Sequence, residues 1–149
     1  MPDVRELYQQ VIIEHNKKPR NFGTLEPHTH FADGYNPLCG DQIQLHLNVA
    51  NGHIQDIKFQ GHGCAISTAS SSLMTSHVKG RPVEEAEKLV EAFREMVRGE
   101  LDPAENPQRF GKLVVFQGIK NLPSRVKCAV LPWATLHAAL KGEETTSTE

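Results

Sequence analysis

The chain has 149 residues, 38% of them hydrophobic, with a formal net charge of −2. This length is typical of one domain, and the near-neutral charge argues against a nucleic-acid binder. No apolar run approaches the roughly 20 residues that cross a bilayer, and the N-terminus carries no secretory signal. We therefore expect a cytoplasmic globular protein with no membrane partner, whose three cysteines are reduced thiols.

A first helix is predicted from Val4 to about Lys17, because apolar residues recur at helical spacing and Pro19 ends the pattern. The next residues, from Arg20 to Leu38, have no periodicity and contain two glycines and two prolines. They are predicted to form a long loop, and loops of that length in small domains are usually functional or mobile.

Residues 42–50 alternate between apolar and polar side chains, which predicts a half-buried strand with His46 on its solvated polar face. Asn51-Gly52 follows and favours a type I′ hairpin turn. The return strand is predicted from His53 to Gln60, with a bulge near Gln55 where the alternation changes phase. Together these residues predict a β-hairpin.

The residues after this hairpin are predicted to form a third short strand that turns into a helix from about Ser67 to Val78. Cys64 lies at this strand-to-helix junction. Small serine and alanine side chains dominate the start of the helix and permit close packing. A further amphipathic helix opens at Pro82 and ends near Gly99.

The C-terminal part begins with a linker, predicted for residues 100–108 because it contains two prolines. Residues 111–122 fit either a strand or a helix on local grounds. The last helix is predicted from about Ser124 to Lys141, with Cys128 near its start. We expect residues 1–142 to form a single domain and the polar residues 143–149 to be a disordered tail.

The segment Asn36-Pro37-Leu38-Cys39-Gly40-Asp41 is the most unusual in the chain. Gly40 separates a thiol from a carboxylate and permits a tight turn that aims both at one point. Cys64 and Cys128 lie at other segment junctions, and segment ends gather at one edge of a small α+β domain. We infer that Cys39, Asp41, Cys64 and Cys128 supply the four ligands of a tetrahedral zinc site.

Such a site carries a formal charge of −2, because one zinc ion meets three thiolates and one carboxylate. Arg125 and Lys127 flank Cys128 and are placed to offset this charge. Two alternatives remain open at this point. Each cysteine fits a small buried apolar residue, and Cys-Gly-Asp also occurs in ordinary turns where the aspartate caps an amide. His62, two residues before Cys64, is a possible substitute ligand.

With these residues assembled, the chain resembles the U-type iron–sulfur cluster assembly proteins, the IscU and SufU family. The resemblance spans nearly the whole chain, and it rests on several motifs in the same order: residues 8–23, 36–41, 63–75 and Cys128. It implies an α+β fold with a three-stranded antiparallel sheet packed by about five helices and a metal site at one edge. It also implies that Cys39, Asp41, Cys64 and Cys128 are the metal or cluster ligands.

Two features resemble the zinc-bound SufU-like branch more than the scaffold members. Scaffold members have a histidine immediately before the third cysteine, where this chain has Lys127. An additional helical segment, about Phe93 to Phe110, also precedes the last motif. Arg125 and Lys127 match the pattern of the SufU-like branch before Cys128.

The resemblance implies a Zn²⁺-bound sulfur carrier that accepts persulfide sulfur from a cysteine desulfurase, with Cys39 as the accepting thiolate. Its activity is then similar to that of a sulfurtransferase. The alternative is a scaffold, which is not an enzyme, on which a transient [2Fe–2S] cluster forms before transfer to downstream assembly or acceptor proteins. A third hypothesis is a structural zinc module for protein interaction. Thiolate ligands suit both metals and do not decide among these hypotheses.

Overall fold

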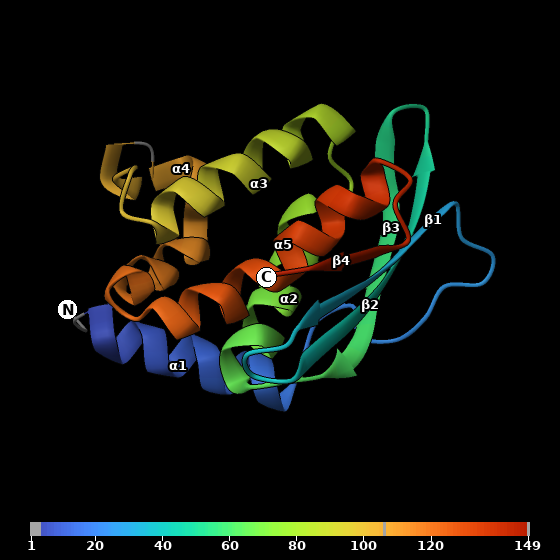
Figure 1. The fold of residues 1–149 in the computed structure, drawn as a ribbon. Helices are drawn as coiled ribbons and strands as arrows, with labels where there is room; N and C mark the ends of the chain where they lie inside the picture. Colours follow the sequence, from blue (N-terminus) through green and yellow to red (C-terminus); the bar gives the residue numbers. More distant parts are fainter. Residues whose placement is uncertain (1–3, 106, 149) are drawn as a thin grey trace.

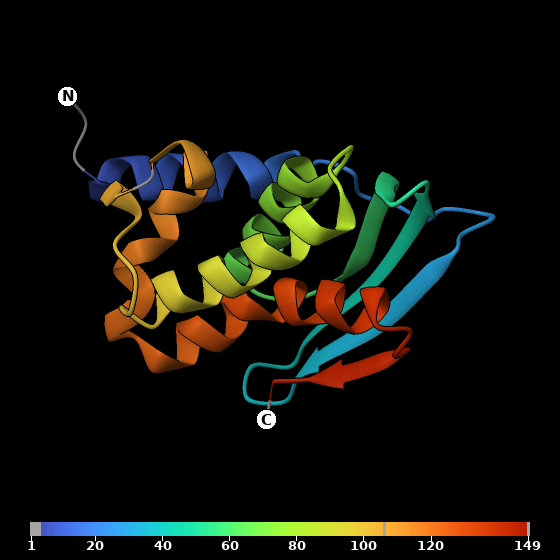
Figure 2. The same ribbon diagram turned by 90° about the horizontal axis from the view of Figure 1, so that it is seen from above.

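The structure, a computed structural model, describes residues 4–105 and 107–148. All of its longer helices lie on one side of a twisted sheet, as Figures 1 and 2 show from two directions. The helices are α1 (Val4–Lys17), α2 (Ala65–Val78), α3 (Val83–Val97), α4 (Pro107–Phe110) and α5 (Pro123–Leu140). The strands are β1 (His30–Asn36), β2 (Asp41–Ala50), β3 (His53–His62) and β4 (Thr145–Ser147), in the order β3-β2-β1-β4.

The hairpin of β2 and β3 forms where the sequence predicts it. Asn51 and Gly52 both have positive φ, 55° and 75°, which is the conformation of a type I′ turn. The predicted bulge is also present, because Asn48 pairs with Asp56 while Val49 pairs with Ile54. Gln55 is thus the additional residue, and it moves the later apolar side chains of β3 onto the buried face.

Strand β1 corrects the prediction of a loop from Arg20 to Leu38, since residues 30–36 pair antiparallel with β2. Gly34, one of the two glycines of the predicted loop, lies within β1, and the structure gives the reason for a glycine there. A Cβ at this position would lie 1.9 Å from Oγ1 of Thr135 on α5. The glycine therefore permits close packing of α5 against the sheet rather than marking a turn.

The sheet is four-stranded and mixed, not the three-stranded antiparallel sheet that the resemblance implied. The fourth strand, β4, runs parallel to β1 at the edge. It comes from the segment expected to be a disordered tail. The N–H of Asp33 donates to the carbonyl of Glu144 at 2.8 Å, and that of Thr148 donates to the carbonyl of Tyr35 at 3.1 Å. The exposed backbone groups of β1 thus provide hydrogen-bond partners for β4, and the polar composition of the tail gives no sign of this pairing.

Helix α2 is the central helix, in contact with α1, α5 and β3. It begins at Ala65 directly after β3, so the separate short strand predicted before Ser67 is absent from this described segment. Its buried serines are hydrogen-bonded. Ser70 Oγ donates to the carbonyl of Ala129 at 2.6 Å and accepts from Nε1 of Trp133 at 3.1 Å. Small hydroxyl side chains therefore join α2 tightly to α5.

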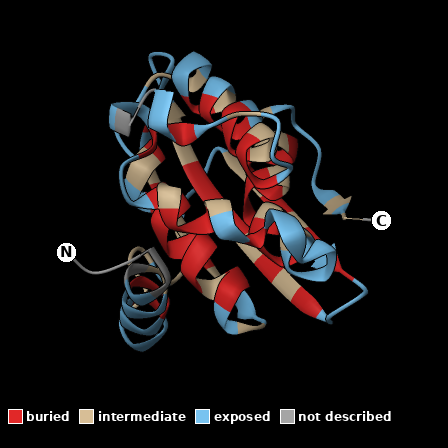
Figure 3. Cartoon of the chain, turned by 90° about the vertical axis from the view of Figure 1, so that its left-hand side faces the viewer, coloured by how far each residue is buried: buried red, intermediate tan, exposed pale blue. Residues whose placement is uncertain are grey.

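The chain between α3 and α5 folds into short helical pieces, namely a 3₁₀ turn at Pro103–Glu105, helix α4 and a 3₁₀ helix at Gly111–Asn121. This resolves the ambiguity of residues 111–122 in favour of a helical structure. Burial is concentrated where the helices face each other and the sheet, whereas most of α1 is exposed (Figure 3). Among the described residues, no helix is both long enough and apolar enough to span a membrane.

Candidate metal centre

The predicted ligands lie where three segments meet at one end of the sheet. Cys39 is in the turn of residues 37–40 between β1 and β2, and Asp41 is the first residue of β2. Cys64 immediately precedes α2, and Cys128 lies in the second turn of α5. The β1–β2 turn reaches the start of α2 (Figure 1), which brings these segments together despite their distance in sequence.

Three of the four side chains form one compact group. Ligand atoms of Cys39, Asp41 and Cys128 all lie within 4.8 Å of one another. The two sulfur atoms are 3.4 Å apart, and Cys128 is oriented to donate its S–H to Cys39. Asp41 and Cys128 are fully buried, whereas Cys39 is exposed. The group therefore has a fixed inner side and one thiol that solvent or a partner can reach.

Asp41 is held in place by both of its carboxylate oxygens. Oδ1 accepts the backbone N–H of Cys64 at 2.8 Å, and Oδ2 accepts Nδ2–H of Asn36 at 3.1 Å. Nδ2 of Asn36 also lies 3.6 Å from Sγ of Cys128. Gly63 makes room for the carboxylate, because a Cβ there would lie 2.7 Å from Oδ1. These contacts orient the carboxylate before any ligand binds.

Cys64 lies beside this group but outside the 4.8 Å cluster. It is the N-cap residue of α2, and its sulfur accepts the N–H of Ser67 at 3.5 Å. The hydrogen bond from its own backbone to Asp41 keeps it next to the cluster. The Cys64 thiol is one of the groups that raise the pKa of Cys128.

Several thiols and a carboxylate lie close together in the site, and this proximity affects the pKa of Cys128. Burial raises the pKa of Cys128, and hydrogen bonds with Cys39, Asp41 and Cys64 raise it further. Burial likewise raises the pKa of Tyr8, which the Arg125 guanidinium opposes. Cys39, Asp41 and Cys128, which carry negative charge when ionised, thus lie close together with Cys64 beside them, and two of these four residues are buried. A divalent cation stabilises such an arrangement.

The two basic residues predicted to support the site are both exposed on α5. The positive charge of Arg125 lowers the pKa of Tyr8, whereas the charges of the Cys64 and Cys128 thiolates raise it. Lys127 precedes Cys128 on the exposed surface of the helix. His62 is exposed at the end of β3 and is not part of the group of Cys39, Asp41 and Cys128.

Two histidines are buried, and one of them, His46, was expected to be solvated. His46 is 7% exposed, and His15 is 4% exposed. His46 alternates onto the polar face of β2 as predicted, but this part of the face is covered by the chain between α1 and β1. Burial lowers the pKa of both imidazoles, so each ring is neutral near neutral pH.

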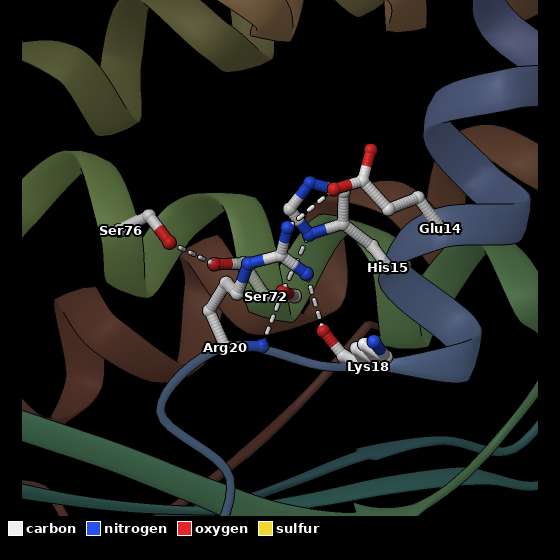
Figure 4. Close-up of polar contacts among 6 residues, drawn as sticks. All are labelled: Glu14, His15, Lys18, Arg20, Ser72 and Ser76. Atoms are coloured by element: carbon white, nitrogen blue, oxygen red, sulfur yellow. Dashed lines mark hydrogen bonds and ion pairs between the residues drawn. The ribbon is translucent and has the colours of Figure 1, made fainter.

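His15 joins α1 to the central helix (Figure 4). Its Nδ1 lies 2.6 Å from Oγ of Ser72, and the same oxygen accepts the backbone N–H of Arg20 at 2.8 Å. The guanidinium of Arg20 pairs with Glu14 and with the carbonyl of Lys18. This network fixes the point where the chain leaves α1 and crosses toward the sheet.

Sequence reasoning did not identify Asn36 and Gly63 as parts of the centre. Asn36 begins the segment that contains Cys39 and Asp41, but the sequence assigns its side chain no role; it is fully buried and contacts both Asp41 and Cys128. The available signal was its polar amide next to the Cys-Gly-Asp turn. Gly63 carried no comparable signal, because its role depends on a carboxylate 22 residues away in sequence.

The donor set fits zinc, because thiolate sulfur and carboxylate oxygen are ordinary zinc ligands and the site has a buried carboxylate with fixed orientation. The pattern of the family described as "NifU-like N terminal domain" matches residues 7–129. The chain is 40% identical over 139 residues to the "Zinc-dependent sulfurtransferase SufU" of Bacillus subtilis, covering 93% of this chain and 92% of that protein.

A second relative is the "Iron-sulfur cluster assembly scaffold protein IscU" of Streptococcus pyogenes, 40% identical over 138 residues, which cover 93% of this chain and 85% of that protein. Among solved structures, a putative iron–sulfur cluster assembly scaffold protein for the SUF system from Fervidobacterium islandicum superimposes with a TM-score of 0.83. The two sequences are 34% identical, and the match covers 91% of this chain and 98% of that one. Both the sequence and the fold therefore have relatives along nearly their full length.

Proposed function

Because this chain belongs to the NifU-like N-terminal domain family, we propose that it is a zinc-dependent sulfur carrier for iron–sulfur cluster assembly. In this role it accepts persulfide sulfur from a cysteine desulfurase and delivers it to downstream assembly proteins. The ligands of the zinc are Cys39, Asp41, Cys64 and Cys128. The proposal draws on the B. subtilis relative, which is named a zinc-dependent sulfurtransferase, and on the departures from the scaffold pattern at Lys127 and before α5.

The observation that carries this proposal is the asymmetry of the cluster. Cys39 is exposed in a turn, while its two nearest ligand partners, Asp41 and Cys128, are fully buried. A carrier needs one thiol that a partner enzyme can reach, and buried neighbours that hold this thiol in a defined position. The backbone supports such a turn, because Gly40 has φ 74° and its N–H donates to the carbonyl of Asn36 at 2.8 Å.

The transfer itself is a thiol–disulfide exchange without net oxidation. The Cys39 thiolate attacks the terminal sulfur of the desulfurase persulfide, a new S–S bond forms on Cys39, and the bond to the desulfurase cysteine breaks. The desulfurase cysteine leaves as a thiolate, so electrons and protons balance. A bound zinc ion supplies a positive charge that keeps the thiols of the site ionised at neutral pH.

The other residues of the site prepare Cys39 for this step. Cys128 lies 3.4 Å from the Cys39 sulfur and anchors the turn to α5. Asp41, bonded to Asn36 and to the backbone of Cys64, provides a hard oxygen ligand next to soft sulfur ligands. Such a ligand is exchanged more readily than a thiolate, so Asp41 tunes how easily the site opens.

The second candidate function is a scaffold on which a transient [2Fe–2S] cluster forms. The S. pyogenes and F. islandicum relatives, whose names describe scaffolds, favour it. The same four ligands suit a cluster. One difference argues against a scaffold. The residue before Cys128 is an exposed lysine, Lys127, whereas scaffold members have a histidine at this position. The carrier is therefore the function that this chain supports better.

One experiment separates these functions. Zinc-loaded protein is incubated with a cysteine desulfurase, cysteine and a thiol reductant while sulfide release is followed, and iron is then added anaerobically. Stimulated sulfide release without a stable visible chromophore is the expected result. A stable chromophore at stoichiometric yield supports the scaffold instead. The absence of both indicates a structural zinc module.

The variant Cys39→Ser tests the role of the exposed thiol. We expect the stimulation of sulfide release to be lost while the fold is kept, because Cys39 lies in an exposed turn. The matched control is Ser124→Ala, a change at another exposed position near the site, which should leave the stimulation unchanged. Full stimulation by Cys39→Ser contradicts the assignment of Cys39 as the sulfur acceptor.

A further inference from the structure

A second group of metal-binding side chains lies on the face of the sheet away from the helices. It consists of Glu26 and His28, from the chain between α1 and β1, and His46 in the middle of β2. One ligand atom from each residue lies within 4.8 Å of the others. The His28 and His46 rings meet edge to face, with centroids 4.9 Å apart. Nothing in the proposed sulfur chemistry uses these residues.

His46 is the member of the group that most requires a ligand. Its side chain is 7% exposed, and its Nδ1 is buried without a hydrogen-bond partner. It is the one such side-chain atom found in residues 4–105 and 107–148. A buried polar atom left unpaired costs about 1–3 kcal/mol, and native proteins rarely leave one without a reason. A nitrogen lone pair in this position suits a cation.

One ring nitrogen of His28 is available to bind a metal. Its Nδ1 lies 3.0 Å from the carbonyl oxygen of Leu25, and a carbonyl can only accept, so Nδ1 carries the proton. Nε2 of the neutral ring therefore holds the free lone pair. A backbone carbonyl bonded to the second ring nitrogen is the usual support of a ligating histidine. Glu26 Oε1 lies 3.6 Å from the protonated Nδ1 of this ring, and Glu26 contributes the carboxylate oxygen that lies within 4.8 Å of ligand atoms of His28 and His46.

Hydrogen bonds to β2 fix the segment that carries Glu26 and His28 to the sheet. Asn48 Nδ2 donates to the carbonyl of Pro27 at 3.2 Å, and the N–H of Thr29 donates to the carbonyl of Leu47 at 2.9 Å. The N–H of Val49 in turn donates to Oγ1 of Thr29 at 2.8 Å. The geometry of the group is thus set by the backbone of β2.

An aromatic side chain closes one wall of the group. Phe31 of β1 pairs with His46 across the sheet, and the ring centroids are 5.1 Å apart. Lys58 of β3 is the partner of His46 on the other side, and its aliphatic stem runs toward Gly23. The His28 side chain is 30% exposed and that of Glu26 is 76% exposed, so the group is open to solvent on one side.

We propose that Glu26, His28 and His46 form a second metal site that binds a divalent first-row transition cation, with Zn²⁺ as the occupant. Two imidazoles and one carboxylate are a ligand set that zinc uses, with water in the fourth position. Ligands without sulfur also distinguish this site from the cysteine centre. The proposal does not depend on the sulfur-carrier function.

The two sites are physically separate. His46 follows Asp41 by five positions along β2, which corresponds to about 17 Å in an extended strand. Asp41 is in phase with Ile43, Leu45 and Leu47, which face the core, whereas His46 projects from the opposite face. One ion therefore cannot be shared between them, and each should be counted independently.

The test is the zinc stoichiometry of the full chain, measured by equilibrium dialysis and elemental analysis. We expect two equivalents for the wild type and one for His46→Gln and for His28→Gln. The matched control His53→Gln removes an exposed histidine at the start of β3 and should keep two. Because His28 is partly exposed, its variant keeps the test valid even if His46→Gln folds poorly.

Cobalt substitution identifies which site is filled. The cysteine centre gives a sulfur-to-cobalt charge-transfer band, which should persist unchanged in His28→Gln, whereas the second equivalent adds none. In NMR spectra, the imidazole signals of His28 and His46 should shift with the second equivalent of zinc. A wild type that binds one equivalent, with these signals unmoved, overturns the second site. That outcome leaves the sulfur-carrier proposal intact, because the thiolate band reports on it separately.

Discussion

Gly63→Ala tests whether the preorganised carboxylate of Asp41 matters to the centre. Gly63 lies between β3 and α2, and its φ is outside the left-handed region, so alanine meets no backbone strain there. The new Cβ would lie 2.7 Å from Oδ1 of Asp41 and 3.2 Å from its Cβ and Cγ. Because the carboxylate is short, buried and hydrogen-bonded at both oxygens, it cannot rotate away without losing its partners.

The magnitude follows from the contact that is lost. The bond from the N–H of Cys64 to Asp41 is 2.8 Å long, and hydrogen bonds to charged groups contribute about 1.5–3 kcal/mol. Alanine in place of glycine restricts the unfolded chain and returns about 0.4–1 kcal/mol. The free energy of unfolding of the zinc-free protein should therefore fall by about 1–2 kcal/mol. Zinc affinity should fall at least tenfold, about 1.4 kcal/mol, because one ligand is displaced.

Urea denaturation of the zinc-free protein measures the first effect, and competition with a chromophoric zinc chelator measures the second. Gly118→Ala is the matched control, because no atom lies within 4 Å of a Cβ at that position. It should leave zinc affinity unchanged. If Gly63→Ala matches Gly118→Ala in both measurements, the carboxylate is not held as described and the reasoning is refuted.

Three further predictions concern the rest of the fold. Ser70→Ala leaves the carbonyl of Ala129 and Nε1 of Trp133 without their hydrogen bonds to this serine. It should lower the free energy of unfolding, measured by urea denaturation, by about 2–4 kcal/mol. A loss below about 0.5 kcal/mol would contradict the role of this serine. Burial lowers the pKa of His15 below its ordinary value of 6.5, so the unfolded chain binds more protons below pH 6.5 and stability should fall as the pH drops through that range. His15→Gln should flatten this dependence, and an unchanged slope would show that His15 does not cause it. Removal of zinc with a chelator should lower the midpoint of thermal unfolding and speed amide hydrogen exchange in the turn at residues 37–40, because a metal that binds only the folded protein stabilises the folded state. Equal exchange rates with and without zinc would argue against a metal at this turn.

Local pattern predicted those parts of the fold whose causes are local. The alternation of residues 42–50 and the Asn51-Gly52 turn specify the β2–β3 hairpin, including the bulge at Gln55, because side-chain period and turn conformation depend on neighbouring residues. Helix α1 has the predicted bounds for the same reason. Strand β1 was missed because its Gly34 serves a contact with Thr135, and β4 was missed because a short polar strand exists only through its partner β1.

The sequence alone determined the chemistry available to this protein. Cys39, Asp41, Cys64 and Cys128 were predicted as ligands because they lie at segment junctions and because thiols and carboxylates are the groups that bind zinc. Only the tertiary structure decided how these groups are arranged: that Cys39 is exposed while Cys128 is buried, that Asn36 and Gly63 position Asp41, and that His46 lies beneath a covering segment. The physical reason is that residue type sets which bonds an atom can form, whereas burial and distance depend on segments far apart in the chain.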